Sequence, residues 1–221
     1  MRKKLLLIMV LALCLPLAVG VASAQDDEPI RIGLLVDQSG WLTLYGIEQE
    51  NGFKLGLLYE AGINPTEYDS INAALEDVRI AGRPVEIIVR DYGSENPAAD
   101  ADNAASLARE LIESDFVDII YGTPNSGAAL TVQQLTAPDD YDLIFMAGPA
   151  ATPTLTGETF NVNTFRICRN TDQDALTFAT VADEFGSTYV QLAIDTDFGR
   201  GTAQAFQDSL EAQGIEFVGD V

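Results

Sequence analysis

The sequence predicts an α/β fold in which a parallel β-sheet forms one lobe and a second α/β lobe begins near the C-terminus. Short β-rich runs alternate with stretches of helical periodicity, as in parallel sheets with crossover helices. Two turns of small residues, GTPNSGAAL and AGPAAT, also follow two successive strand runs. In open α/β sheets, turns at the carboxyl ends of neighbouring strands form the ligand pocket.

The N-terminus has the three parts of a secretory signal. A basic segment at 2–4 is followed by an apolar run at 5–21 and by Ala22-Ser23-Ala24, so cleavage is expected after Ala24. The alternative, a retained membrane anchor, is disfavoured by this small-residue cleavage pattern. We therefore expect a signal peptide over 1–24 and a periplasmic or extracellular protein. Cys168 would then be the only mature thiol, and we expect it to be a buried, small apolar side chain.

Six strands are expected where β-branched and aromatic residues cluster between turn signals. Five helices are expected in the gaps between them, and the helix over 97–113 carries alanine and leucine at spacings of three and four residues, which gives it one apolar face. The expected strands cover 30–36, 84–90, 117–121, 143–147, 189–194 and 215–218. The expected helices cover 45–60, 97–113, 127–135, 173–184 and 199–212.

Two stretches interrupt this alternation. Residues 63–82 are polar and contain Asn64-Pro65, which predicts a surface excursion with a short amphipathic turn around 71–75. Residues 164–168 alternate like an edge strand after a loop, and the βα pattern resumes after them. We expect the chain to cross between lobes here, with an N-terminal lobe over 25–165 and the start of an incomplete second lobe over 166–221.

The charge balance excludes several classes of partner. The chain carries 34 acidic and 12 basic residues, and removal of the signal takes away three basic residues and no acids, which lowers the net charge from −22 to −25. Such a chain is repelled by nucleic acids and by anionic membranes. A solvated acidic surface that favours solubility, or a salty habitat, is the simplest interpretation of this charge.

The sequence offers no catalytic or metal-binding constellation. It contains no histidine, which excludes Ser-His-Asp and Cys-His mechanisms and histidine metal sites within this chain. Asp139-Asp140 and the pair Asp195 and Asp197 could act as carboxylate pairs or bind calcium, but neither fits a calcium loop, so solvated loop acids are favoured. The run GLLVDQSG lacks the dinucleotide fingerprint. We expect no cofactor, no metal and no enzymatic activity, and the secreted-hydrolase alternative is disfavoured.

The two small-residue turns instead favour a small anion. Ser126 can cap a helix that begins at Gly127. The end of that helix supplies partial positive charge and directed N–H donors, and the second turn, at 147–152, contributes further backbone groups and the hydroxyl of Thr152. A carboxylate is the expected guest.

The mature chain resembles the type I periplasmic substrate-binding proteins, especially the branched-chain amino acid-binding branch of ABC importers. The opening run at 32–36 with Ser39-Gly40, Tyr45-Gly46 and Asn51-Gly52 carries the resemblance. The later landmarks follow in the family's order, and the ordered series is more specific than any one motif. They are Asp91, Gly122, Ser126, Pro149-Ala150-Ala151-Thr152, Arg166, Asp172-Gln173 and Phe198-Gly199-Arg200-Gly201.

The resemblance implies roles for the first turns. In the family, the turn serine and the AAT turn hold the ligand's α-carboxylate, which implies that Ser126, Ala150 and Thr152 bind it here. Asn125 flanks the serine and is included in the expected site. The competing interpretation of Ser126 is a helix cap without a ligand.

The resemblance also implies two aromatic pocket residues. Tyr45 would line the side-chain pocket, and Phe198 would face the ligand from the second lobe. Many family members carry tyrosine at the position of Phe198, so a hydroxyl is missing here. Packing in the core is the competing interpretation for both rings.

The resemblance implies an extracytoplasmic solute-binding component of an ABC importer. It would bind an amino acid, with branched-chain side chains favoured, or a small amide, and would deliver it to a membrane permease as a monomer. The alternative is the extracellular sensor domain of a receptor with the same fold. Family members have two complete lobes, so we expect this chain to be a fragment whose ammonium-binding residues lie beyond Val221 and whose own affinity is weak.

Overall fold

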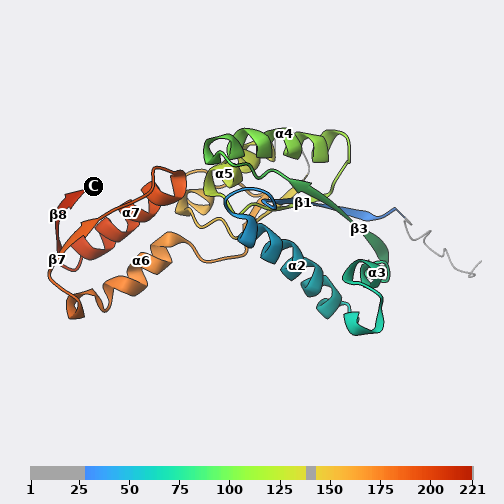
Figure 1. Ribbon diagram of the computed structural model, residues 1–221, viewed down its shortest axis with the longest axis horizontal. Helices are drawn as coiled ribbons and strands as arrows, with labels where there is room; N and C mark the ends of the chain where they lie inside the picture. The colour runs from blue at the N-terminus through green and yellow to red at the C-terminus, as the bar shows by residue number, and fades with distance from the viewer. Residues whose placement is uncertain (1–27, 138–142, 221) are drawn as a thin grey trace, which may run out of the picture.

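The computed structural model describes residues 28–137 and 143–220 (Figure 1). The expected signal peptide over 1–24 and the pair Asp139-Asp140 lie outside these residues. Within them, the chain forms two units, a six-stranded sheet with its helices and a two-stranded sheet with two helices. The predicted α/β class is therefore correct.

The larger sheet has the order β2-β3-β1-β4-β5-β6, and all of its neighbouring strands are parallel except β2 and β3. Parallel pairing brings the carboxyl ends of the central strands to one edge, where a ligand site is expected. The strands are β1 (Ile30–Val36), β2 (Arg79–Ile80), β3 (Arg83–Asp91), β4 (Ile119–Gly122), β5 (Ile144–Ala147) and β6 (Thr164–Arg166).

Helices cover both faces of this sheet. On one face, α2 (Thr43–Glu60) packs against the β1 residues that alternate with Leu35, and α3 (Ile71–Leu75) packs against α2 and against Val85 and Ile87 of β3. On the other face, Leu35 itself joins a core formed with α4 (Asp100–Glu113) and α5 (Ser126–Leu135). Both faces of β1 are therefore buried, which explains the continuous apolar run over residues 32–36.

The second unit restarts the βα pattern after the edge strand β6. It contains α6 (Thr171–Ala179), β7 (Thr188–Gln191), α7 (Asp197–Glu211) and β8 (Glu216–Asp220), and β7 pairs with β8 in parallel. Its small core gathers Ala179, Ala182, Leu210 and Ile215 beside the ring of Phe178. Figure 1 shows this unit at the end of the molecule opposite to α3.

Several sequence-based expectations need correction. The helix expected over 173–184 ends at Ala179, and a short 3₁₀ turn at Ala182–Glu184 follows it. The strand expected over 189–194 ends at Gln191, so the residues after it are free to form the loop that leads into α7. The excursion over 63–82 is partly internal, because Ala74, Leu75 and Val78 pack against Leu58 of α2.

Cys168 also differs from expectation. It is half-buried rather than buried, and its thiol donates to the carbonyl oxygen of Ala150 over 3.4 Å. The edge-strand prediction for 164–168 is correct for its first three residues, which form β6 at the edge of the sheet. No helix within 28–137 and 143–220 combines the length and the apolar character needed to span a membrane.

Candidate functional site

The two small-residue turns lie side by side at the carboxyl edge of the sheet. Strands β4 and β5 are parallel neighbours, and Gly122 pairs with Ala147 at their ends. The backbone N–H of Gly148 then donates to the carbonyl oxygen of Gly122 over 3.0 Å, which ties one turn to the other. The sequence prediction that these turns converge is therefore correct.

The cap of α5 is Asn125, not Ser126 as expected. The Asn125 side chain accepts a hydrogen bond from the N–H of Ala128 over 3.1 Å, and its carbonyl oxygen accepts from Ala129. Ser126 is instead the first residue of the helix, is buried, and has a hydroxyl with no hydrogen-bond partner among the described residues. The N–H groups of Ser126 and Gly127 have no acceptor within the helix. Hydrogen-bond donors at this end of α5 are therefore available to a ligand.

A buried carboxylate fixes the orientation of Asn125. Asp100 is fully buried at the start of α4, and its Oδ2 accepts from Asn125 Nδ2 over 3.2 Å and from Trp41 Nε1 over 2.8 Å. Hydrogen bonds to an ionised acceptor are stronger than those between neutral groups. Asp100 therefore connects the cap of α5 to the aromatic side chain in the loop after β1.

Tyr92 also holds the turn before α5 in place. Its hydroxyl accepts the backbone N–H of Asn125 over 3.2 Å, and its ring is buried. Burial raises the pKa of Tyr92 well above its ordinary value, because the charged phenolate would lose its hydration. The hydroxyl is consequently neutral and remains available to the turn.

The loop between β1 and α2 and the first turn of α2 place three side chains beside the α5 turn. The buried carboxylate of Asp37 accepts from the N–H of Gly40 over 2.6 Å and from that of Leu42 over 3.0 Å. These bonds fold the chain tightly over the end of β1, so that Trp41, Leu42 and Tyr45 follow in succession at the edge of the sheet.

The second unit contributes the opposite wall from the start of α7. Thr196 caps this helix by accepting the N–H of Gly199 over 3.1 Å, and Phe198 lies in its first turn. Asp195 and Asp197 both pair with Arg200. No group of metal-ligating side chains occurs in the described ranges. Asp195 precedes α7, whereas Asp197 is its first residue, so both acids belong to an ion-pair cluster at the start of this helix.

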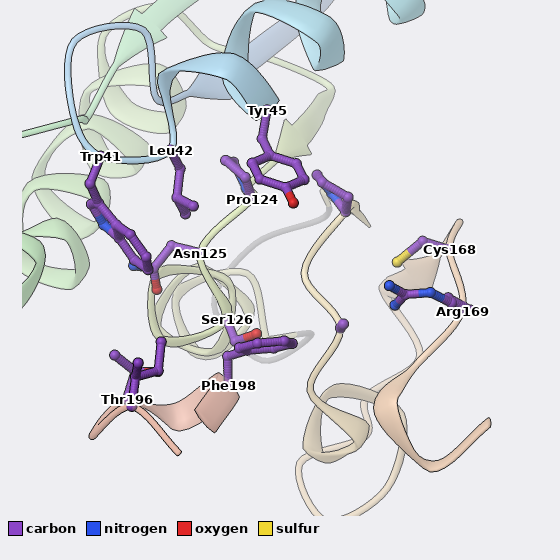
Figure 2. Close-up of a pocket in the computed structure, with 13 residues that line it drawn as sticks. Trp41, Leu42, Tyr45, Pro124, Asn125, Ser126, Cys168, Arg169, Thr196 and Phe198 are labelled. Atoms are coloured by element: carbon purple, nitrogen blue, oxygen red, sulfur yellow. The ribbon is translucent and has the colours of Figure 1, made fainter. Parts of the chain in front are cut away.

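These elements enclose a cavity of about 520 Å³ between the two units (Figure 2). Its walls come from the β1–α2 loop, the two turns, the segment after β6 and the loop before α7. The lining residues are Trp41, Leu42, Tyr45, Pro124, Asn125, Ser126, Pro149, Ala151, Cys168, Arg169, Ile194, Thr196 and Phe198.

Four of the six residues expected at the site line this cavity: Ser126, Asn125, Tyr45 and Phe198. Tyr45 and Phe198 are 55% and 41% exposed, so neither ring is packed in the core. That placement argues against the core-packing alternative, and ligand binding by these residues stays a prediction.

The other two expected residues, Ala150 and Thr152, are buried behind the cavity wall. The carbonyl oxygens of both accept hydrogen bonds from the guanidinium of Arg166, and the residue between them, Ala151, lines the cavity instead. Arg166 is part of β6, so these hydrogen bonds hold the AAT turn against that strand.

Sequence reasoning missed several lining residues. Trp41 could have been found as a large aromatic directly after Gly40, in the loop that follows the first strand. Ile194 and Thr196 carry no local signal, because they reach the cavity through the packing of the second unit against α5, and Arg169 reaches it from the segment after β6, which hydrogen bonds hold to the second turn. The two units approach closely here, because a Cβ built on Gly127 of α5 would lie 2.8 Å from Oδ2 of Asp197 in α7.

The fold consists of two α/β units with a cavity between them. The model of the family described as "Periplasmic binding protein" matches residues 29–221, and the chain belongs to that family. The family and the similar structures are solute-binding proteins, not enzymes. No curated protein matches the sequence.

Solved structures of ABC-transporter proteins share this fold. A solute-binding protein from Rhodopseudomonas palustris HaA2, in complex with p-hydroxybenzoic acid, is 27% identical with a TM-score of 0.69, over 88% of this chain and 46% of that one. An ABC-type branched-chain amino acid transporter protein from R. palustris CGA009 is 28% identical with a TM-score of 0.61, over 87% and 46%.

A leucine-binding protein from Thermotoga maritima is 17% identical with a TM-score of 0.68, over 87% of this chain and 48% of that one, and at this identity it shows the fold alone. The chain therefore spans about half the length of the structures it matches.

Proposed function

We propose that this chain carries the primary ligand-binding surface of an extracytoplasmic solute-binding protein of an ABC importer, and that the solute is a small carboxylate held at the N-terminus of α5. One observation carries the proposal: the Ser126 hydroxyl lies at that helix end without a hydrogen-bond partner among the described residues, in a cavity lined by exposed aromatic rings. A helix N-terminus favours an anion through its partial positive charge and free N–H groups.

Transport would proceed by closure of the two units on the solute. The cavity has walls from both units, so a solute that touches Ser126 and Phe198 together favours the closed arrangement. A permease that recognises the closed form then receives only loaded protein. A secretory signal over 1–24 would deliver the chain to the periplasm, where a monomer is sufficient for this task.

The resemblance to the branched-chain branch favours an amino acid or small amide as the solute. A second candidate, an aromatic acid, is favoured by a specific feature of the cavity. Three exposed rings, those of Trp41, Tyr45 and Phe198, border the space beside Ser126. Offset stacking against such rings stabilises an aromatic solute beyond simple burial, and the R. palustris HaA2 neighbour was solved with p-hydroxybenzoic acid.

Calorimetric titration of the full-length protein, as its gene encodes it, tests the proposal. The panel contains leucine, isoleucine and valine, benzoate and 4-hydroxybenzoate, and a small aliphatic amide. We expect saturable binding of at least one carboxylate at a single site. Binding of amino acids alone selects the first candidate, and binding of benzoates alone selects the second. The absence of heat with every member of the panel would overturn the proposal.

A further inference from the structure

The charge of the cavity lining is opposite in sign to that of the chain. The whole sequence has 34 acidic and 12 basic residues, whereas the 13 lining residues include no acid and one base, Arg169. A strongly acidic protein repels anions at long range. A local positive charge offsets this repulsion, and Arg169 places one in the lining.

Arg169 is positioned to face a solute. It lies between β6 and α6, next to Cys168, and Figure 2 shows its guanidinium directed into the cavity from a different wall than the one that carries Ser126. Its ion pair is an exposed one, in which Nη1 lies 3.1 Å from Asp174 Oδ2 and the Arg169 side chain is 61% exposed. Exposed ion pairs contribute little to stability, and one carboxylate leaves several guanidinium donors free.

Closure of the units would remove this guanidinium from water, and the donors that Asp174 does not use would then need a compensating partner. A carboxylate is the partner that matches the planar fork of an arginine in a bidentate pair. The rings of Trp41, Tyr45 and Phe198 border the same cavity and supply apolar surface for the part of the solute that joins its polar ends.

We propose that Arg169 forms a second anion subsite, so that the solute is a dicarboxylate with an apolar spacer of about the size of a benzene ring. One carboxylate binds at Ser126 and the N-terminus of α5, and the other pairs with Arg169. This inference rests on the proposed function for the first carboxylate. It adds the second acid group and the residue that selects it.

The experiment compares terephthalate, which has two carboxylates, with benzoate, which has one on the same ring. Affinities are measured by calorimetry for the full-length wild-type protein and for Arg169→Gln, Arg169→Lys and Arg109→Gln. Arg109 is exposed on α4 and does not line the cavity, so its variant controls for the loss of one positive charge.

We expect the affinity of the wild-type protein for terephthalate to exceed its affinity for benzoate by about tenfold or more. Arg169→Gln should remove this advantage and leave benzoate binding nearly unchanged, Arg169→Lys should retain part of it, and Arg109→Gln should retain all of it. Alkylation of Cys168 gives a second readout, because terephthalate bound beside Arg169 should slow the reaction of this neighbouring thiol more than benzoate does.

Three results would overturn the inference while the proposed function stands: equal wild-type affinities for the two acids, an unchanged terephthalate affinity in Arg169→Gln, or an equal loss of both acids in that variant. The last result would mean that Arg169 and Ser126 share one carboxylate. The wild-type comparison needs no variant, so it decides the question even if Arg169→Gln folds poorly. Failure of every carboxylate to bind would instead overturn the proposed function, and this inference with it.

Discussion

The indole Nε1 of Trp41 donates a hydrogen bond of 2.8 Å to the carboxylate of Asp100, which is fully buried. The same carboxylate oxygen accepts from Asn125, the cap of α5. One buried charge therefore sets the position of an aromatic wall of the cavity relative to the helix end that is proposed to bind the solute. Trp41 is also the only tryptophan in the sequence, so its fluorescence reports on this wall alone.

Substitution of Asp100 by Asn should destabilise the protein and loosen the wall. A neutral amide replaces the charged acceptor of three hydrogen bonds, from Trp41, Asn125 and Ser94, which should cost about 1–3 kcal/mol. Urea unfolding measures this cost, and Trp41 emission should shift to longer wavelength as the indole loses its partner. Asp102→Asn removes the same charge from an exposed position in the same turn of α4. It should lose only the helix-dipole contribution, about 0.3–1 kcal/mol, with unchanged emission. Equal effects of the two substitutions would contradict a positioning role for Asp100.

Two glycines of α2 should respond in opposite directions to alanine. A Cβ on Gly46 would lie 1.8 Å from the carbonyl oxygen of Asp37, and backbone cannot move aside cheaply. Gly46→Ala should therefore destabilise the fold by about 3 kcal/mol or more. A Cβ on Gly52 meets nothing within 4 Å, so Gly52→Ala should stabilise the helix by up to about 1 kcal/mol. Urea midpoints that fall together in both variants would show that the approach of α2 to Asp37 is not as close as described.

Alkaline pH should weaken the fold through Tyr92. Burial raises the pKa of Tyr92 above its ordinary value of about 10. The unfolded chain therefore loses this proton at a lower pH than the folded chain. The stability contribution is fully present below about pH 10 and falls above it, by up to about 1.4 kcal/mol per pH unit.

Tyr92→Phe isolates this effect. The variant should lose about 1–3 kcal/mol near neutral pH, because the N–H of Asn125 loses its acceptor. Its stability should then decline less steeply than that of the wild type between about pH 10 and 11, as followed by urea unfolding at each pH. Tyr121, whose pKa burial also raises, is present in both proteins and accounts for a shared slope. Parallel curves for wild type and variant would exclude Tyr92 as the source.

The ring of Tyr45 should contribute to binding, whereas a second tyrosine on the same helix should not. Tyr45 lines the cavity, and Tyr59, near the other end of α2, is 82% exposed. For whichever solute the titrations identify, Tyr45→Ala should weaken binding by about tenfold, or ~1.4 kcal/mol, through lost ring contact. Tyr59→Ala should leave the affinity unchanged. A Tyr45→Ala protein that binds as tightly as wild type would place the solute away from this wall.

Elements whose local pattern and tertiary environment agree could be predicted from the sequence. The strand Ile30–Val36 has the bounds expected, because both of its faces are buried and its apolar run over residues 32–36 is unbroken. The helix expected over 173–184 failed because Thr180 and Val181 form a turn that ends α6 before the 3₁₀ segment. Helical periodicity across residues 173–184 carries no signal for that interruption.

The candidate site was predictable in part for the same reason. The convergence of two turns follows from parallel strand order, so Ser126 and Asn125 were placed correctly at the cavity. The choice between them as the cap was wrong, since both residue types cap helices well and the outcome depends on Tyr92 and Asp100, which are distant in sequence. Arg169 was missed because the segment after β6 carries no local signal for its path, which hydrogen bonds to the second turn determine, such as that from the Thr171 N–H to the Ala151 carbonyl oxygen.

The affinity of Ser126→Ala for the bound carboxylate tests the central claim most directly. Asn125 still caps α5 in this variant, so the helix and its stability should persist. Calorimetry should show binding weakened by about tenfold or more, ~1.4 kcal/mol, relative to wild type. Ser106→Ala, an exposed serine substitution on α4, should bind as wild type does. An affinity unchanged by Ser126→Ala would show that the solute's acid group does not bind at the end of α5.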